Sequence, residues 1–223
     1  MKSQVQIRLL KIYDLLLEHF GPQSWWPGET KLEICVGAIL TQNTAWSNVE
    51  KAILSLKKEN YMELGRLKEI KTKKLASLIK SSGYFNVKAE RLKSFINYFA
   101  NRHRGNFNNL FKGKLEDIRH SLLSVNGIGP ETADSMLLYA GEIPVFVVDA
   151  YTKRIFSRLK LTDKNATYDE LQSFFMKNLP GKTTLYNEYH ALIVMLGKYY
   201  CKPKPVCGSC PLKKCPSRKN KNS

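Results

Sequence analysis

The stretch LLSVNGIGPETADSMLLYA, residues 122–140, predicts two helices joined by a tight turn. Gly127 and Gly129 can adopt backbone conformations closed to other residues, and they let another chain approach closely. Pro130 suits the first turn of the second helix, where its missing N–H costs little. The free N–H groups that follow Gly129 can face an anion such as a DNA phosphate. An ordinary helical hairpin with glycines in its loop is the alternative, because Gly-x-Gly alone is weak evidence.

The charge balance supports an anionic partner. The 223 residues include 36 Lys and Arg against 19 Asp and Glu, a net charge of +17. This excess favours nucleic acid first, an acidic membrane surface second, and a merely basic protein third. No apolar run approaches the roughly 20 residues that span a bilayer, and the charged N-terminus makes a poor signal peptide. We therefore expect a cytoplasmic monomer that has no membrane partner and lies in a reducing compartment.

The rest of the chain predicts an all-α protein large enough for one or two domains. No useful segment alternates between apolar and polar residues, and the run VFVV at 145–148 is too short to argue for a sheet. The last eight residues, PSRKNKNS, should form a solvated basic tail. Apolar residues recur at helical spacing in residues 5–20, 29–59, 72–84, 87–103, 114–125, 130–141, 167–180 and 186–201.

Asp149 ends the apolar run in IPVFVVDAYTKR, residues 143–154. Ionised carboxylates avoid apolar surroundings unless something compensates them. A hairpin that grips a phosphate would place this carboxylate near the same nucleotide, and Lys153 follows as a further candidate DNA contact. The alternative is an aspartate that only caps the helix starting near Tyr151. None of the four histidines stands beside one of these motifs, so Asp149 has no obvious partner acid.

Four cysteines near the C-terminus have the spacing C-x5-C-x2-C-x4-C: Cys201, Cys207, Cys210 and Cys215. Four thiols this close together indicate a metal site, since disulfides are rare in a reducing compartment. Zinc sites usually contain two C-x2-C pairs and this segment has one, so an iron–sulfur cluster fits better and zinc is the alternative. Cys35 lies far away on an apolar helix stripe and is assigned to the core.

Taken together, these motifs resemble the endonuclease III branch of the helix-hairpin-helix DNA glycosylases over nearly the whole chain. The resemblance implies a 4Fe-4S cluster, double-stranded DNA with a damaged base as partner, and two helical lobes with a DNA cleft between them. The lobes are a helical barrel at 25–140 and a discontinuous cluster domain at 1–24 and 141–223. Gln42 would fill the gap left by a flipped-out nucleotide. The matching stretches are LTQNTAW (40–46), SSGYFNVKAERL (81–92), VNGIGPETA (125–133), VFVVDAYTKR (145–154) and HALIVMLGKYYC (190–201).

The resemblance also implies a mechanism. Loss of the base builds positive charge on the sugar, which a carboxylate in a water-poor site stabilises strongly. Asp149 would therefore be the catalytic residue, and it could also orient or deprotonate the attacking water. Family members that also cut the backbone carry a lysine two residues after the second hairpin glycine, where this chain has Glu131. A carboxylate cannot form a Schiff base, so we expect a monofunctional glycosylase.

The tryptophans bear on the substrate. All three, Trp25, Trp26 and Trp46, flank one predicted helix together with Pro27. They could simply be core residues. However, WWP followed by LTQNT and an aromatic residue resembles the 3-methyladenine glycosylase subgroup, which holds a cationic base between aromatic rings. The alternatives are a pyrimidine-lesion glycosylase with lyase activity and, in another class, a non-catalytic DNA-binding protein.

Overall fold

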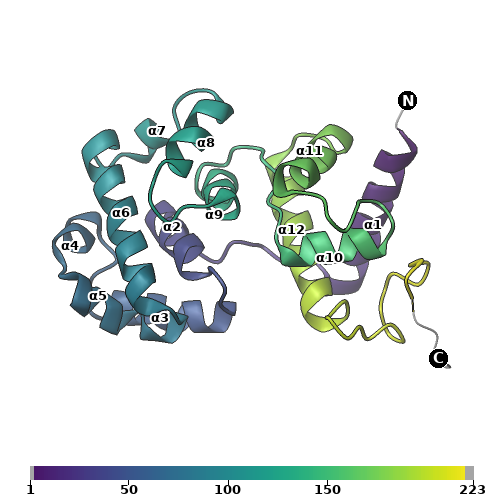
Figure 1. Cartoon of the computed structure of the whole chain (residues 1–223), viewed down its shortest axis with the longest axis horizontal. Helices are drawn as coiled ribbons and strands as arrows, with labels where there is room; N and C mark the ends of the chain where they lie inside the picture. Colours follow the sequence, from purple (N-terminus) through teal and green to yellow (C-terminus); the bar gives the residue numbers. More distant parts are fainter. Residues whose placement is uncertain (1–2, 219–223) are drawn as a thin grey trace. The chain divides into compact units, whose positions relative to one another are not determined.

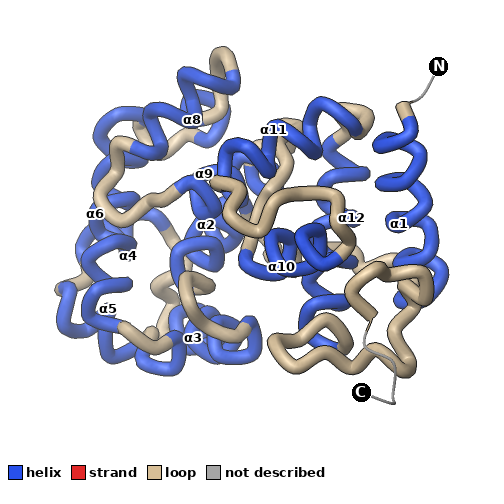
Figure 2. Tube along the Cα trace, turned by 45° about the vertical axis from the view of Figure 1, so that its right-hand side comes forward, coloured by secondary structure: helices blue, strands red, loops and turns tan. Residues whose placement is uncertain are grey.

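The structure is a computed structural model that describes residues 3–218, so residues 219–223 of the predicted basic tail lie outside the described residues. Figure 2 shows a helical chain, and no residue in the range 3–218 forms a strand. This confirms the predicted all-α class. Across the same range, no helix is long and apolar enough to cross a membrane. The chain forms two compact units, one made by Trp26–Ile143 and the other by the described residues on either side of it.

The unit Trp26–Ile143 is built around α2. Eight of the ten residues of α2 are buried, as is typical of a helix that is apolar all round. It packs against α6, α9 and η2. The helices of this unit, labelled in Figure 1 where space allows, are α2 (Lys31–Leu40), α3 (Trp46–Lys58), α4 (Leu64–Glu69), α5 (Thr72–Leu78), η1 (Lys80–Ser82), α6 (Phe85–His103), α7 (Phe107–Leu110), α8 (Leu115–Leu123), α9 (Pro130–Ser135) and η2 (Met136–Ala140).

A buried lysine anchors the start of the loop between α2 and α3. Lys88 Nζ donates hydrogen bonds to the carbonyl oxygens of Leu40, at 2.8 Å, and Ser82, at 2.6 Å. Thr44 Oγ1 donates to the same Ser82 oxygen at 2.7 Å. Burial, with a smaller contribution from Arg91, lowers the pKa of Lys88 to about 8. The lysine thus satisfies a carbonyl at the end of α2 that has no partner within the helix.

The second unit contains α1 (Gln4–Phe20), α10 (Ala150–Arg158), α11 (Tyr168–Asn178) and α12 (Thr183–Tyr199). α12 packs against both α1 and α10. On the α1 side, the buried Tyr189 hydroxyl donates to the Leu9 carbonyl at 2.8 Å. On the α10 side, a Cβ at Gly197 would lie 2.7 Å from Cγ of Tyr151. Glycine is therefore required for α10 and α12 to approach this closely.

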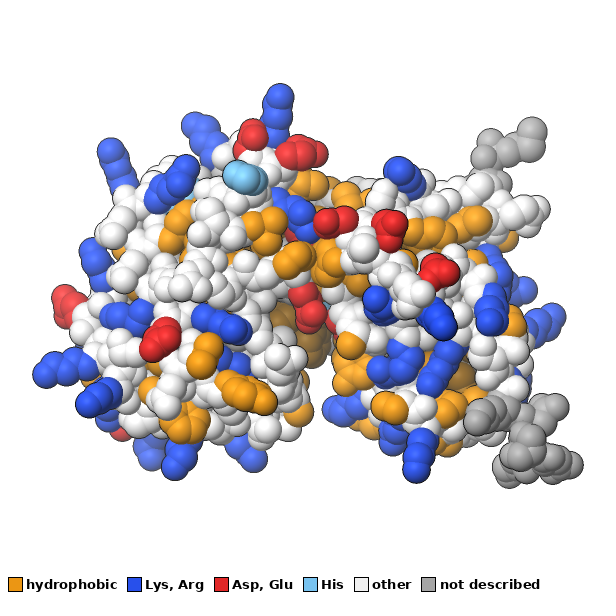
Figure 3. Space-filling model, viewed as in Figure 1, with side chains coloured by type: hydrophobic (Ala, Val, Ile, Leu, Met, Phe, Trp, Pro, Cys, Tyr) orange, Lys and Arg blue, Asp and Glu red, His pale blue; other side chains and the backbone are white. Residues whose placement is uncertain are grey.

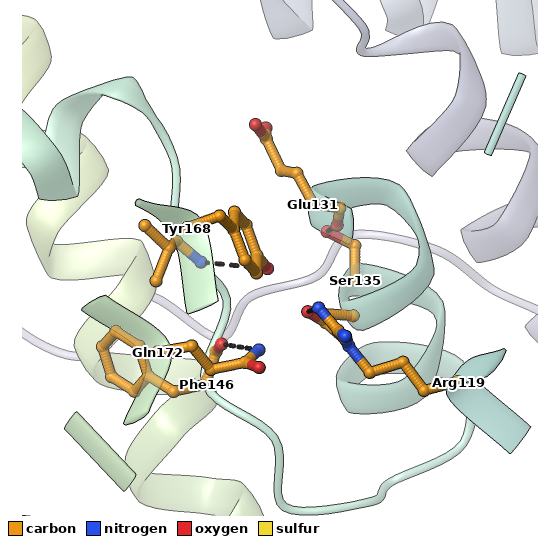
Figure 4. A network of polar contacts seen from close by, with 8 residues as sticks. Arg119, Glu131, Ser135, Phe146, Tyr168 and Gln172 are labelled. Atoms are coloured by element: carbon orange, nitrogen blue, oxygen red, sulfur yellow. Dashed lines mark hydrogen bonds and ion pairs between the residues drawn. The ribbon is translucent and has the colours of Figure 1, made fainter. Parts of the chain in front are cut away.

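The run VFVV forms a buried, non-helical segment that leads into α10. Two of its backbone groups are satisfied by side chains of α11 rather than by a sheet. Gln172 Nε2 donates to the Phe146 carbonyl at 2.8 Å, and the Val148 N–H donates to the Tyr168 hydroxyl at 3.5 Å (Figure 4). The Phe146 ring stacks on Phe175 with ring centres 4.1 Å apart. This packing anchors the segment and places Asp149 at its end.

Candidate active site

The two hairpin glycines serve different purposes in the turn between α8 and α9. Gly127 has a φ of +85°, and a Cβ there would lie 2.6 Å from Cδ of Arg91. Gly129 is exposed at the N-terminus of α9, and a Cβ there would meet nothing within 4 Å. Pro130 is the first residue of α9, as predicted. Gly127 is therefore required by the fold, whereas Gly129 leaves open space over the first turn of the helix.

An ion pair that the sequence did not reveal joins the hairpin helices. Arg119 on α8 donates from Nε to Oδ1 of Asp134 at 2.8 Å and from its terminal nitrogen to Oδ2 at 3.2 Å. The Asp134 side chain has no exposed surface, so both of its oxygens need donors. Glu131 is exposed in the first turn of α9 and extends away from Arg119 (Figure 4).

Gln42 lies against the hairpin turn. Its Nε2 donates to the Gly127 carbonyl at 3.0 Å and to Thr132 Oγ1 at 2.9 Å, and its carbonyl oxygen accepts from Arg91. The loop between α2 and α3 and the hairpin therefore form one polar cluster, although they are 85 residues apart in sequence. These hydrogen bonds hold the Gln42 side chain in place against the hairpin turn.

Two of the three tryptophans meet in the unit Trp26–Ile143. The Trp26 ring lies edge-on to Trp46 at 4.9 Å, and Tyr139 packs against it at 5.0 Å. Gly37 on α2 leaves room for both indoles, since a Cβ there would lie 3.3 to 3.5 Å from their atoms. Tyr139 lies in η2, a π-helical turn of a kind frequent at functional sites, and sequence reasoning missed it. Trp25 belongs to the other unit, and Pro27 is exposed.

Asp149 caps α10 and also contacts α12. Its Oδ1 accepts hydrogen bonds from the Thr152 N–H at 2.7 Å and from Thr152 Oγ1 at 2.8 Å. Asp149 therefore does cap the helix, as the alternative interpretation of the sequence expected. Its other oxygen, Oδ2, lies 3.6 Å from Nε2 of His190, and the two side chains are 10% and 8% exposed. His190 is thus a neighbour of Asp149 that the sequence did not indicate. The helical pattern of residues 186–201 placed His190 on a helix, but only the packing of α12 on α10 brings it to Asp149.

The environment keeps the Asp149 carboxyl ionised. Burial raises its pKa, but His190 and the two Thr152 hydrogen bonds together outweigh burial and hold the pKa below its usual value. The net effect is a buried negative charge that survives because specific donors surround it. Such a charge is suited to stabilise positive charge that develops beside it.

The four cysteines of the C-terminal segment line one apolar pocket, together with Leu196 and Leu212. Burial, and then the three other thiols, raise the pKa of Cys210. Within residues 3–218, no three His, Cys, Asp or Glu side chains lie close enough together to bind a single metal ion. Two arginines of α10 contact the segment at Cys201. Arg154 Nε donates a hydrogen bond to the Cys201 carbonyl oxygen at 2.7 Å, and a terminal nitrogen of Arg158 lies 3.3 Å from the Cys201 sulfur. Four soft donors around one pocket have the chemistry that an iron–sulfur cluster requires.

Residues 36–181 match the HhH-GPD superfamily of base excision DNA repair proteins. The chain belongs to this superfamily. A Methanocaldococcus jannaschii protein named as a candidate DNA repair glycosylase, MJ1434, is 47% identical over 96% of this chain and 97% of its own length. Endonuclease III of Thermotoga maritima is 30% identical over 81% of this chain and 79% of its own length. The chain is therefore a DNA glycosylase of base excision repair, similar to endonuclease III.

Solved structures agree with this assignment. The 3-methyladenine DNA glycosylase of H. pylori, bound to 1,N6-ethenoadenine, has a TM-score of 0.76 and 31% identity over 88% of this chain and 98% of its own. An endonuclease III bound to DNA has a TM-score of 0.81 over 97% of each chain, at 21% identity, which shows that the fold is shared.

The surface of this DNA glycosylase is basic. Figure 3 shows Lys and Arg side chains spread over the visible face of each unit, and Lys153 on α10 is exposed.

Sequence reasoning missed one exposed aromatic residue, Tyr84, which is 73% exposed and has a φ of +45°. It follows Gly83, which lies beside Thr44 of the α2–α3 loop. A bulky residue directly after a glycine at a helix junction was the available signal.

Proposed function

We propose that this glycosylase hydrolyses the N-glycosidic bond of alkylated purines such as 3-methyladenine, without strong lyase activity. The observation that carries the proposal is the ring cluster of Trp26, Trp46 and Tyr139. A 3-methylated adenine is cationic, and electron-rich ring faces attract cations. The similarity to the H. pylori enzyme, whose structure holds an ethenoadenine, points the same way.

Asp149 is proposed as the catalytic residue. Because 3-methyladenine is already charged, it leaves without strong acid catalysis, so the main requirement is a negative charge beside the sugar. The low pKa of Asp149, which the donors around it cause despite burial, meets that requirement. Gln42, Gly127, Gly129 and Lys153 are proposed to contact the DNA, with Trp25 and Pro27 adding to the base pocket.

Glu131 is proposed to exclude strong lyase activity. It is exposed in the first turn of α9, at the hairpin position where lyase members carry the nucleophilic lysine. A carboxylate there cannot attack the sugar to form a Schiff base. Water activated near Asp149 is then the nucleophile.

Cys201, Cys207, Cys210 and Cys215 are proposed to hold a 4Fe-4S cluster, with zinc as the alternative. Such a group joins distant ligands and stabilises the segment that follows α12. Arg154 and Arg158 help to orient the segment by holding the backbone around Cys201.

A panel of duplexes tests the proposal. Each duplex carries 3-methyladenine, 1,N6-ethenoadenine, uracil or an oxidised pyrimidine, and each reaction is analysed with and without alkaline cleavage of abasic sites. We expect the methylated purine to be excised fastest, with strand cleavage only after alkali. Faster excision of oxidised pyrimidine with spontaneous strand cleavage would instead support an endonuclease III activity, which the four cysteines and the T. maritima relative favour.

A further inference from the structure

His190 is an unusual residue for the buried face of α12. The other buried residues of this helix are two tyrosines, a glycine and aliphatic residues. A buried imidazole loses hydration, and this loss must be offset by specific contacts. One such contact is with Asp149, whose Oδ2 lies 3.6 Å from His190 Nε2. Gly197, further along α12, permits the close approach of α10 that makes this contact possible.

We propose that His190 is a positioning residue for the Asp149 carboxylate. Thr152 holds Oδ1 with two hydrogen bonds, and His190 Nε2 lies 3.6 Å from Oδ2, so each oxygen faces a polar group of a different side chain. These contacts on both oxygens limit rotation of the carboxylate. Electrostatic stabilisation is strongest when the charge is already oriented before the reaction. This inference rests on the proposed catalytic role of Asp149.

His190 also affects the pKa of the Asp149 carboxyl group. Among the described residues, His190 on α12 and Thr152 on α10 are the groups that favour the ionised carboxylate, and burial opposes them. Loss of the His190 donor would leave burial less opposed, so the carboxyl would take up a proton at higher pH.

Two substitutions separate this role from simple packing. His190→Gln places an amide N–H near the position of Nε2, whereas His190→Asn is polar but too short to reach Oδ2. His103→Asn is the control, because His103 is a partly buried histidine that hydrogen-bonds to Tyr98 but lies in the other unit. Circular dichroism and thermal melting establish that each variant is folded.

The first readout is affinity for a duplex with a cationic pyrrolidine in place of the sugar, compared with a neutral tetrahydrofuran duplex. This measurement does not depend on which base is excised. We expect His190→Asn to lose affinity for the cationic duplex by about 10- to 100-fold, the range for a hydrogen bond to a charged group. His190→Gln and His103→Asn should stay within about threefold of wild type, below a single such bond.

The second readout is the pH profile of methylated purine excision. The acid limb should move to higher pH in His190→Asn and return toward wild type in His190→Gln. An unchanged profile and affinity in a folded His190→Asn would overturn the inference, as would equal losses in the Asn and Gln variants. If Asp149→Asn also binds the cationic duplex like wild type, the proposed role of Asp149 fails instead.

Discussion

Replacement of Gly127 by alanine tests how the hairpin is built. A non-glycine residue at positive φ costs about 1–2 kcal/mol. The new Cβ would also lie 2.6 Å from Cδ of Arg91, so Arg91 must move away from Gln42. We take about 1 kcal/mol for this lost hydrogen bond, below the range for fully buried charged pairs, because both side chains are partly exposed. The expected destabilisation is about 2–3 kcal/mol, or a melting temperature lower by roughly 4–12 °C.

Gly129→Ala is the matched control in the same turn. Its φ is negative and its Cβ would meet nothing within 4 Å, so stability should change by less than about 0.5 kcal/mol. Thermal melting of both variants measures the difference, and abasic duplex affinity measures any separate effect on DNA binding. Equal stability of the Gly127→Ala and wild-type proteins would refute the argument, because neither the backbone strain nor the displacement of Arg91 would then exist.

Five further predictions concern the chemistry and the cysteine segment. Asp149→Asn should lower single-turnover excision by roughly 100-fold or more while abasic duplex affinity is retained, because only the charge is removed; near wild-type excision would contradict this. Since donors hold the pKa of Asp149 below its usual value despite burial, wild-type excision should persist as the pH falls to about 4 and be lost only as the carboxyl protonates. Borohydride should fail to trap wild-type protein on damaged DNA because Glu131 cannot form a Schiff base, and efficient trapping would show that another amine acts. Trp46→Ala should weaken excision of methylated purine by about 1–3 kcal/mol but spare abasic duplex binding. Cys207→Ser should reduce bound iron and the melting temperature more than it reduces the rate constant of excision.

Much of the fold could be predicted from the sequence because its signals are local. Helical spacing of apolar residues marks where helices form, and glycine followed by proline marks where the hairpin turns. The hairpin indeed turns at Gly127 and begins α9 at Pro130. The apolar stretch 29–59 did not by itself reveal where α2 ends, because the break at Thr41–Ala45 depends on Lys88 capping it from another helix.

The candidate site was predicted only in part. Asp149 could be singled out because a charge at the end of an apolar run requires an explanation, and the four cysteines could be grouped because they are close in sequence. His190, Tyr139 and Arg91 carried no such local signal. Each acquires its place through contacts with residues far away in the chain.

The sequence by itself therefore determined the helical class, the hairpin, the aspartate and the set of thiols, since each depends on residues within a few turns of one another. The tertiary structure alone decided which side chains surround them. Gly197 sets how closely α12 approaches α10, and that distance decides whether His190 reaches Asp149. Likewise, Gly37 sets the space in which Trp26 meets Trp46. Such contacts depend on the packing of whole helices, which no local pattern of residues specifies.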